Sequence, residues 1–401
     1  MTDFATHWDL DPAVTFLNHG SFGACPRDVL RHQAELRAEM EREPVRFLSR
    51  ELDDRLDVAR AALGAFLGAD PDDLAFVTNA TSGVNAVLRS REFSAGDELV
   101  TTDHAYTACR NALEYVARRT GARVVIAPVP FPVASPDDVI AAVMARVTPR
   151  TRLALLDHVT SPTALVLPIE RLIAELGARG IDTLIDGAHA PGMLPLDLRT
   201  LGATYYSGNC HKWMCTPKGS AFLWVRRDRH ADVHPLTISH GATAKRPGRE
   251  RFRLEFDWTG TSDPTAWLSV PKAIEVVGSL MPGGWPAIMA RNHALALEAR
   301  RLITAVAGTA APCPDGMIGS LASIVLPDGP TTDIYWRRPD PLHPKLFERW
   351  GIEVPIMSWP APPRRLIRIS AQLYNDPAQY VRLADALRKE LGDEEAVAGE
   401  A

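Results

Sequence analysis

The amine best suited to covalent chemistry in this sequence belongs to Lys212, which lies between an imidazole and an indole. His211 and Trp213 flank it, just past the strand-like residues 203–207. Burial lowers the pKa of a lysine, and the neutral amine is a nucleophile. Arginine cannot replace it because the guanidinium stays protonated. An ordinary surface lysine is the alternative, and the two ring-bearing neighbours count against it. The chain has only six lysines: Lys212, Lys218, Lys245, Lys272, Lys345 and Lys389.

A second candidate is the carboxylate of Asp186, which ends the apolar stretch 182–186 and is followed by Gly187-Ala188-His189. A carboxylate at the end of an apolar strand is costly to bury without a cationic partner. A protonated pyridine nitrogen would be such a partner. Taken alone, the residue slightly favours the alternative, an aspartate that caps the next turn.

Three further strand ends carry hydroxyl or aromatic side chains. Residues 78–83 open a helix with small hydroxyl residues and a glycine, and free N–H groups at a helix start favour a phosphate. An ordinary N-cap by Thr81 or Ser82 explains this segment equally well. Tyr106 could stack on a planar ligand or simply pack, and Ser161 could meet a ligand oxygen.

Together these signals are stronger than apart. A phosphate cradle, a ring stacker, a carboxylate for a pyridinium and a Schiff-base lysine, in this chain order, are the parts of a pyridoxal 5′-phosphate (PLP) site. The spacing from Asp186 to Lys212 lets adjacent strand ends present both groups to one ring. The sequence therefore predicts a PLP enzyme.

The elements that must position these residues alternate between strands and helices. Strands are expected at 74–77, 98–102, 123–127, 152–159, 182–186, 203–207 and 221–225, and helices at 26–43, 52–67, 108–120, 137–146 and 169–179. This alternation predicts an α/β fold, a mostly parallel central sheet with helices on both faces. In such sheets ligands bind beyond the carboxyl ends of the strands, where the candidate residues lie.

Three regions are expected along the chain. Residues 1–45 form an N-terminal arm and helix that pack with a small domain, residues 46–280 a large PLP-binding domain, and residues 281–401 the small α+β C-terminal domain. Residues 226–262, rich in Pro, Gly and charge, predict an irregular crossing segment. Two helices are expected next, near 264–280 and 286–306. The rest of the small domain is expected to hold strands near 321–326, 352–356 and 366–370, helices near 341–350 and 377–391, and a frayed tail.

Composition excludes several classes of function. The chain has 401 residues and a formal net charge of −5, and its arginines are scattered, which argues against a nucleic-acid surface. It shows no long apolar run and no signal peptide, so neither a membrane nor export is expected. The five cysteines fit the reducing cytoplasm, and because Cys210 and Cys215 are the only close pair, no metal site is expected. No G-x-G-x-x-G follows the first strand, which disfavours a dinucleotide-binding oxidoreductase.

At this point the sequence resembles a known family, the class V aminotransferase group of fold-type I PLP enzymes. Within that group it is most similar to the isopenicillin-N epimerase-like branch. The phrases that carry the resemblance are LNHGSFGACP (17–26), EPVRFLSRE (43–51), VTNATSGVN (77–85), IDGAHAPG (185–192), HKW (211–213) and RLIRIS (365–370). Two positions depart from the pattern: Asn209-Cys210 replace the usual Ser-Gly, and Ala164 replaces a glycine.

The resemblance implies a role for each matched residue and a homodimer with shared active sites. Lys212 would hold the cofactor as a Schiff base, Asp186 would pair with the pyridine nitrogen, and His189 would lie near the ring. Tyr106 would stack on the ring. The implied phosphate ligands are Thr81, Ser82, Asn209 and His211, with Thr261 reaching the neighbour's phosphate. The implied substrate contacts are Arg368, for the α-carboxylate, and Asn18 and His19 at the entrance.

The expected reaction begins with loss of the Cα proton, which Lys212 is placed to move. Epimerisation of an amino acid or β-elimination at a cysteine conjugate (C–S lyase) in specialised metabolism is expected. Transamination and oxidative deamination stay open. A persulfide-forming desulfurase is disfavoured, because residues 351–368 contain no cysteine. A non-catalytic scaffold with this fold is disfavoured by the presence of both Lys212 and Asp186.

Overall fold

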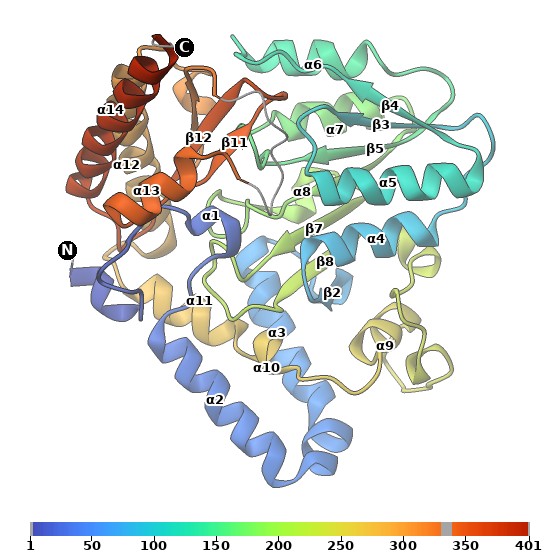
Figure 1. Ribbon diagram of the computed structural model, residues 1–401. Coiled ribbons are helices and arrows are strands. Elements are labelled where there is room, and N and C mark those ends of the chain that lie inside the picture. Colours follow the sequence, from blue (N-terminus) through green and yellow to red (C-terminus); the bar gives the residue numbers. More distant parts are fainter. Residues whose placement is uncertain (1–2, 330–338, 400–401) are drawn as a thin grey trace.

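The computed structural model describes residues 3–329 and 339–399, and a seven-stranded sheet forms its centre (Figure 1). From one edge to the other its strands are β2 (Leu74–Val77), β8 (Ala221–Val225), β7 (Tyr205–Asn209), β6 (Asp182–Asp186), β5 (Thr151–Asp157), β3 (Glu98–Thr102) and β4 (Arg123–Ala127). The strands from β7 to β4 are parallel, and β8 runs antiparallel to both of its neighbours. The predicted mostly parallel sheet is confirmed.

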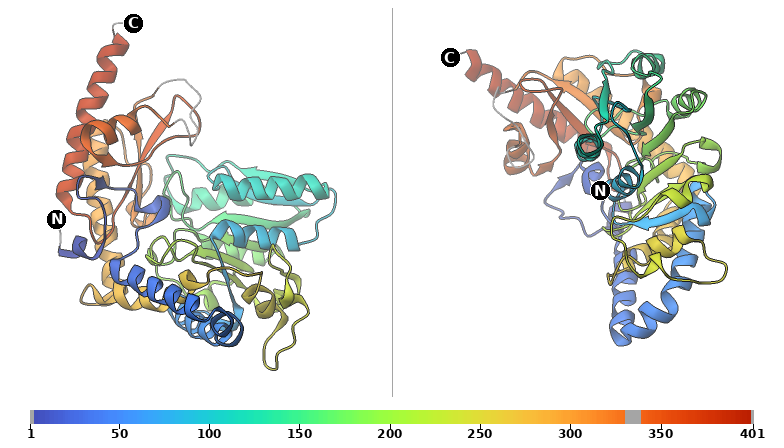
Figure 2. Two further views of the ribbon diagram at one scale, coloured as in Figure 1. Left: turned by 60° about the horizontal axis from the view of Figure 1, so that its bottom comes forward. Right: turned by 90° about the vertical axis from the view of Figure 1, so that its right-hand side faces the viewer.

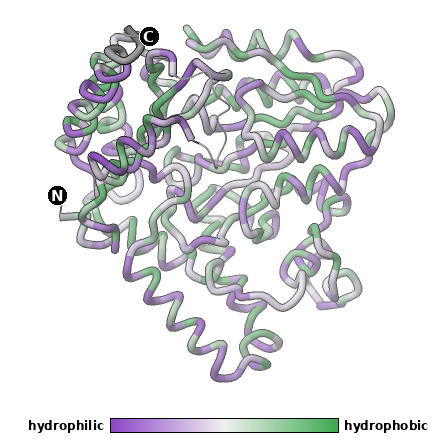
Figure 3. Tube along the Cα trace, viewed as in Figure 1, coloured by the Kyte–Doolittle hydropathy of each residue, from purple (hydrophilic) through white to green (hydrophobic). Residues whose placement is uncertain are grey.

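Helices cover both faces of this sheet because successive side chains of each strand point to opposite sides. In β5, Leu153 and Leu155 belong to one buried cluster and Ala154 and Leu156 to the other. The first cluster includes α4 (Ala80–Ser90), α5 (Thr107–Thr120) and α9 (Arg251–Asp257); the second includes α3 (Leu52–Leu67), α6 (Pro136–Met144) and α7 (Ile169–Gly177). Figure 2 shows the two helical layers, and Figure 3 shows hydrophobic residues concentrated on the central strands.

A smaller antiparallel sheet follows toward the C-terminus. Its strand order is β11 (Ile356–Ser358), β12 (Arg365–Ser370) and β9 (Leu321–Leu326), and it packs with α12 (Gly284–Ala307). The arm strand β1 (Thr15–Phe16) pairs in parallel with β10 (Ile352–Glu353), so the start of the chain lies against its last third (Figure 1). The remaining helices are α1 (His19–Phe22), α2 (Arg27–Arg42), α8 (Leu198–Leu201), α13 (Leu342–Trp350) and α14 (Pro377–Gly399).

Several local expectations were wrong. The segment expected to be irregular, 226–262, contains α9, whose Phe252 and Phe256 pack against the sheet. The single helix expected at 264–280 is two, α10 (Thr265–Leu268) and α11 (Val270–Ser279), because Pro271 has no N–H to continue the first. The expected strand 352–356 is divided between β10 and β11. The tail expected to be frayed belongs to α14 as far as Gly399, and its last two residues, 400–401, lie outside the described residues. Among the described residues, no helix is both long enough and apolar enough to span a bilayer.

Candidate active site

A cavity of about 500 Å³ lies at the carboxyl ends of the central strands and collects most of the predicted residues. Nine of them line it: Thr81, Ser82, Tyr106, Ser161, Asp186, His189, Asn209, His211 and Lys212. Ser21, Phe22, Asn79, Asp157, Val159 and Ala188 complete its walls. Four predicted residues lie outside this lining: Asn18, His19, Thr261 and Arg368.

The Lys212 amine lies 3.2 Å from Nε2 of His189. The Trp213 indole N–H donates to Nδ1 of His189 at 3.4 Å, so this nitrogen must be an acceptor. The neutral ring then carries its proton on Nε2, and this N–H donates a hydrogen bond to the unprotonated amine of Lys212. Burial, reinforced by the charge of Arg368, lowers the pKa of Lys212 to about 8. Both arguments describe a lysine prepared to act as a nucleophile and a base.

His19 does not line the entrance, contrary to expectation; it is fully buried behind Lys212. One ring nitrogen lies 3.0 Å from the carbonyl oxygen of Lys212, and the other lies 2.8 Å from the hydroxyl of Tyr374. Burial lowers the pKa of His19 to about 3, so the ring is neutral and bonds through one donor and one acceptor. His19 therefore fixes the backbone of Lys212.

Asp186 is a buried carboxylate without a cation bonded to it among the described residues. Its Oδ1 accepts the Ala188 N–H at 3.0 Å, and its Oδ2 accepts the Cys109 thiol at 3.0 Å. Burial raises the pKa of Asp186, because a charge is costly in an apolar surrounding. A cationic group in the cavity would offset this cost. The site thus fits a ligand with a protonated ring nitrogen.

A second acid, Asp157, was missed in the sequence. It lies beside Asp186 in register on the neighbouring parallel strand, and it also lines the cavity. Its Oδ1 accepts the Tyr106 N–H at 3.2 Å. Burial and the nearby Asp186 raise the pKa of Asp157 well above its usual range. Two adjacent buried carboxyl groups favour sharing a single negative charge.

The helix start at α4 closes one end of the cavity. The side chain of Asn79 accepts the Ser82 N–H at 2.8 Å, and that of Asn209 accepts the Ala80 N–H at 2.8 Å. Asn209 thereby joins β7 to α4, and the helix start keeps its positive end toward the cavity. The Nδ1 of His211 lies 2.9 Å from the carbonyl oxygen of Ser220. Because a carbonyl oxygen only accepts hydrogen bonds, this Nδ1 carries the proton and donates. Its pKa falls to about 4 through burial, and a bound anion would raise it again.

Arg368 lies just beyond the lining and is 3% exposed. It donates to the carbonyl and hydroxyl oxygens of Ser161 at 2.6 and 3.1 Å and to the hydroxyl of Ser21 at 3.0 Å. Ser21 in turn donates to Oδ1 of Asn18 at 2.5 Å. Within residues 3–329 and 339–399, Arg368 has no ion pair. A buried guanidinium held only by neutral oxygens suits a carboxylate ligand.

The remaining predicted residues differ in their exposure and in their distance from the cavity. Tyr106 is the residue before α5, lines the cavity and is 42% exposed. Thr261 is exposed in the loop between α9 and α10 and does not reach the cavity of its own chain. Ala164 adopts φ 55°, the left-handed conformation that glycine favours, so the backbone of the family pattern is kept at a cost in strain.

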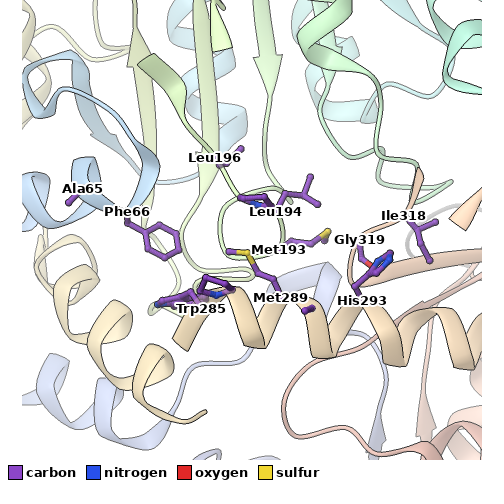
Figure 4. Close-up of a pocket in the computed structure, with 13 residues that line it drawn as sticks. Ala65, Phe66, Met193, Leu194, Leu196, Trp285, Met289, His293, Ile318 and Gly319 are labelled. Carbon is purple, nitrogen blue, oxygen red and sulfur yellow. The ribbon is translucent and has the colours of Figure 1, made fainter. Parts of the chain in front are cut away.

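A separate apolar pocket of about 650 Å³ lies between α12 and residues 193–196 (Figure 4). Phe66, Met193, Trp285 and Met289 line it, and His293 is its one titratable side chain. The Nδ1 of His293 donates a hydrogen bond to the carbonyl oxygen of Gly319, 3.1 Å away. This pocket has no nucleophile or paired acid and base, so the chemistry belongs to the cavity around Lys212.

Comparisons with known proteins agree with this geometry. The sequence profile described as aminotransferase class-V matches residues 25–334. Isopenicillin N epimerase of Amycolatopsis lactamdurans is 38% identical over 394 residues, covering 95% of this chain and 96% of that protein. A probable chloroplastic L-cysteine desulfhydrase of Arabidopsis thaliana is 32% identical, covering 96% and 84%. A solved variant of C-DES, with glycine covalently linked to its PLP cofactor, has a TM-score of 0.75 at 22% identity, covering 94% and 96%.

Proposed function

Since the chain belongs to the class V aminotransferase family and is a PLP-dependent enzyme, we propose a reaction for it. The enzyme labilises the Cα proton of an amino acid or cysteine conjugate. Epimerisation and β-eliminating C–S cleavage are the two outcomes that its relatives support, since one is named an epimerase and another a desulfhydrase. The observation that carries the proposal is the half-buried Lys212 amine, which lies 3.2 Å from Nε2 of His189 and lines the same cavity as the buried Asp186 carboxylate.

The residues present fit the cofactor. Asp186 would hold the pyridine nitrogen, Tyr106 would stack on the ring, and Thr81, Ser82 and His211 would hold the phosphate at the start of α4. Asn209 supports that helix start through Ala80. When bound, PLP supplies a cationic ring that withdraws electrons from a broken Cα bond.

The protein's own groups then carry out the proton transfer. Arg368 binds the substrate α-carboxylate and orients Cα, and Lys212 takes the Cα proton as the general base. His19 and His189 hold the backbone and the amine of Lys212 in place. Return of the proton on the other face gives the epimer, and loss of a β-substituent gives the lyase products.

A panel of D- and L-amino acids and cysteine S-conjugates distinguishes these outcomes. Exchange of the α-hydrogen with deuterium in heavy water, without pyruvate, indicates epimerisation. Pyruvate together with a thiol indicates C–S cleavage. Transfer of the amino group to a keto acid, or oxygen uptake, would instead establish the aminotransferase or oxidative deaminase alternative and overturn the proposal.

A persulfide-forming mechanism is not supported. All five cysteines are buried, and none of them lines the cavity. Burial raises the pKa of the Cys313 thiol to about 11, and its bonded partner is Arg300 rather than any residue of the site. Cleavage without a cysteine nucleophile needs only Lys212 and a leaving group at Cβ.

The lowered pKa of Lys212 predicts how the apoprotein takes up PLP. Only the unprotonated amine attacks the aldehyde, and a pKa of about 8 in place of 10.5 leaves roughly a tenth of it unprotonated at pH 7. The rate of covalent uptake, followed by visible absorption, should rise about tenfold per pH unit and level off near pH 8. A rate that keeps rising through pH 10 would show an ordinary lysine.

Replacing Arg368 by alanine should raise KM for amino-acid substrates by roughly 10–100-fold with a smaller change in kcat, because the variant loses a charge-assisted contact to the α-carboxylate. The matched variant Arg368→Lys keeps the charge but loses the planar fork, so its KM should fall between the two. Steady-state kinetics test this, and an unchanged KM in Arg368→Ala would place the carboxylate elsewhere.

Two broader features also belong to the proposal. A homodimer with shared sites would explain why Thr261 is exposed and remote from its own cavity, since it would then serve the partner's phosphate. A cytoplasmic location is supported by the five free cysteines.

A further inference from the structure

A polar groove of about 680 Å³ continues from the active-site cavity. Tyr106 and Ser161 line both, so the groove begins where the cavity ends. Because Arg368 donates to Ser161, the groove begins beside the predicted α-carboxylate anchor. A substrate held there by its α-carboxylate would have a direct path for its side chain into the groove.

One face of α5 forms the long wall of this groove. Its lining residues are Thr107, Arg110, Asn111, Glu114 and Arg118, which recur at the spacing of a single helix face. A second wall is formed by Met357, Ser358, Trp359 and Pro360, from β11 and the turn after it. The ring centroids of Trp359 and His104 lie 4.5 Å apart, and this contact joins the wall to the large sheet. The groove is therefore bounded by both parts of the molecule.

The charged side chains of the groove differ in the hydrogen bonds and ion pairs that they make. The Asp103 carboxylate accepts the Val129 N–H at 2.9 Å. Arg110 approaches Glu114 only at 3.8 Å, with both side chains 38% exposed, so its N–H donors remain available. Arg118 makes no ion pair in the part of the chain that the structure describes. The Ser358 hydroxyl is buried and lacks a partner in the same part of the chain.

We propose that this groove binds the side chain of the substrate and that Arg110 binds a carboxylate at the far end of that side chain. The inference rests on the proposed function and names the substrate class: α-amino acids that end in a second carboxylate. Arg110 is four residues beyond Tyr106, about 6 Å along the helix axis, whereas Arg118 is about 18 Å away. A side chain with a few methylene groups spans the shorter distance. Met357 and Trp359 would contact its apolar middle.

The test compares two ligands of equal shape on the PLP-loaded enzyme. L-2-aminopimelate ends in a carboxylate, and L-2-amino-7-methyloctanoate ends in an isopropyl group of similar size. Neither carries a leaving group at Cβ, so binding can be measured from the cofactor spectrum. The wild type should bind the dicarboxylate roughly tenfold more tightly, the equivalent of about 1.4 kcal/mol, and added salt should reduce the difference.

Variants of three neighbouring arginines locate the contact. Arg110→Met should reduce the preference to within about twofold. Arg118→Met should keep it, because Arg118 is too distant for this ligand. Arg119→Met is the matched control, since Arg119 bonds the Tyr115 hydroxyl at 2.8 Å and does not line the groove.

The outcomes separate the two claims. Three results would overturn the assignment of Arg110 while the proposed function stands. These are a wild type without a preference for the dicarboxylate, an Arg110→Met variant that keeps that preference, and an Arg118→Met variant that loses it. If neither ligand changes the cofactor spectrum, the proposed amino-acid chemistry fails, and the subsite fails with it.

Discussion

Lys212→Ala should reduce turnover by at least roughly the 10²–10⁴-fold that loss of a positioned general base produces, and should remove the visible band of the lysine-bound cofactor. The variant should still fold, because Lys212 Nζ bonds only to His189 among the described residues and carries no ion pair. Kinetics and absorption measure the first effect, and circular dichroism measures the second.

The matched control is Lys218→Ala. This lysine lies six residues on, is exposed and does not line the cavity. It should keep wild-type turnover and spectrum. Full activity in Lys212→Ala would mean that another base moves the Cα proton, and the mechanism would have to be abandoned.

Asp186→Ala should weaken PLP binding and reduce turnover by roughly 10²–10³-fold, the range for loss of one preorganised electrostatic contact. The reason is that the ring nitrogen would lose the carboxylate that keeps it protonated. Asp186→Asn, which keeps the shape without the charge, should lose nearly as much. Cofactor titration of the apoprotein and steady-state kinetics give both quantities.

Asp182→Asn is the matched control for that series, because Asp182 lies at the opposite end of the same strand and pairs with Arg91 at 2.9 Å. It should change stability modestly and leave cofactor affinity unaltered. Wild-type rates in both Asp186 variants would remove the role assigned to that carboxylate.

Much of the site was predictable because its signals are local. Lys212 and Asp186 both follow apolar strands, and the rule that ligands bind at the carboxyl ends of parallel strands brings them together without further information. The same alternation predicted most of the central strands to the residue, including β2, β3, β4, β6 and β8.

The residues that were missed or misplaced depend on long-range contacts. Asp157 lies inside the strand expected at 152–159, but β5 ends at this residue, and only the register with β6 reveals that it lies beside Asp186. Cys109 had a weak local signal, since it lies in the first turn of α5, three residues after the cavity-lining Tyr106. His19 is buried through β1–β10 pairing and contacts from residues about 350 positions away, which no local pattern contains.

The central claim is that the Lys212 amine, and no other, is joined to PLP. The most direct measurement is reduction of the loaded enzyme with borohydride, digestion and mass spectrometry of the peptides. We predict a pyridoxyl-phosphate adduct on Lys212 alone, with the other five lysines unmodified. An adduct on a different lysine, or none on a protein that shows the cofactor's absorption, would contradict it.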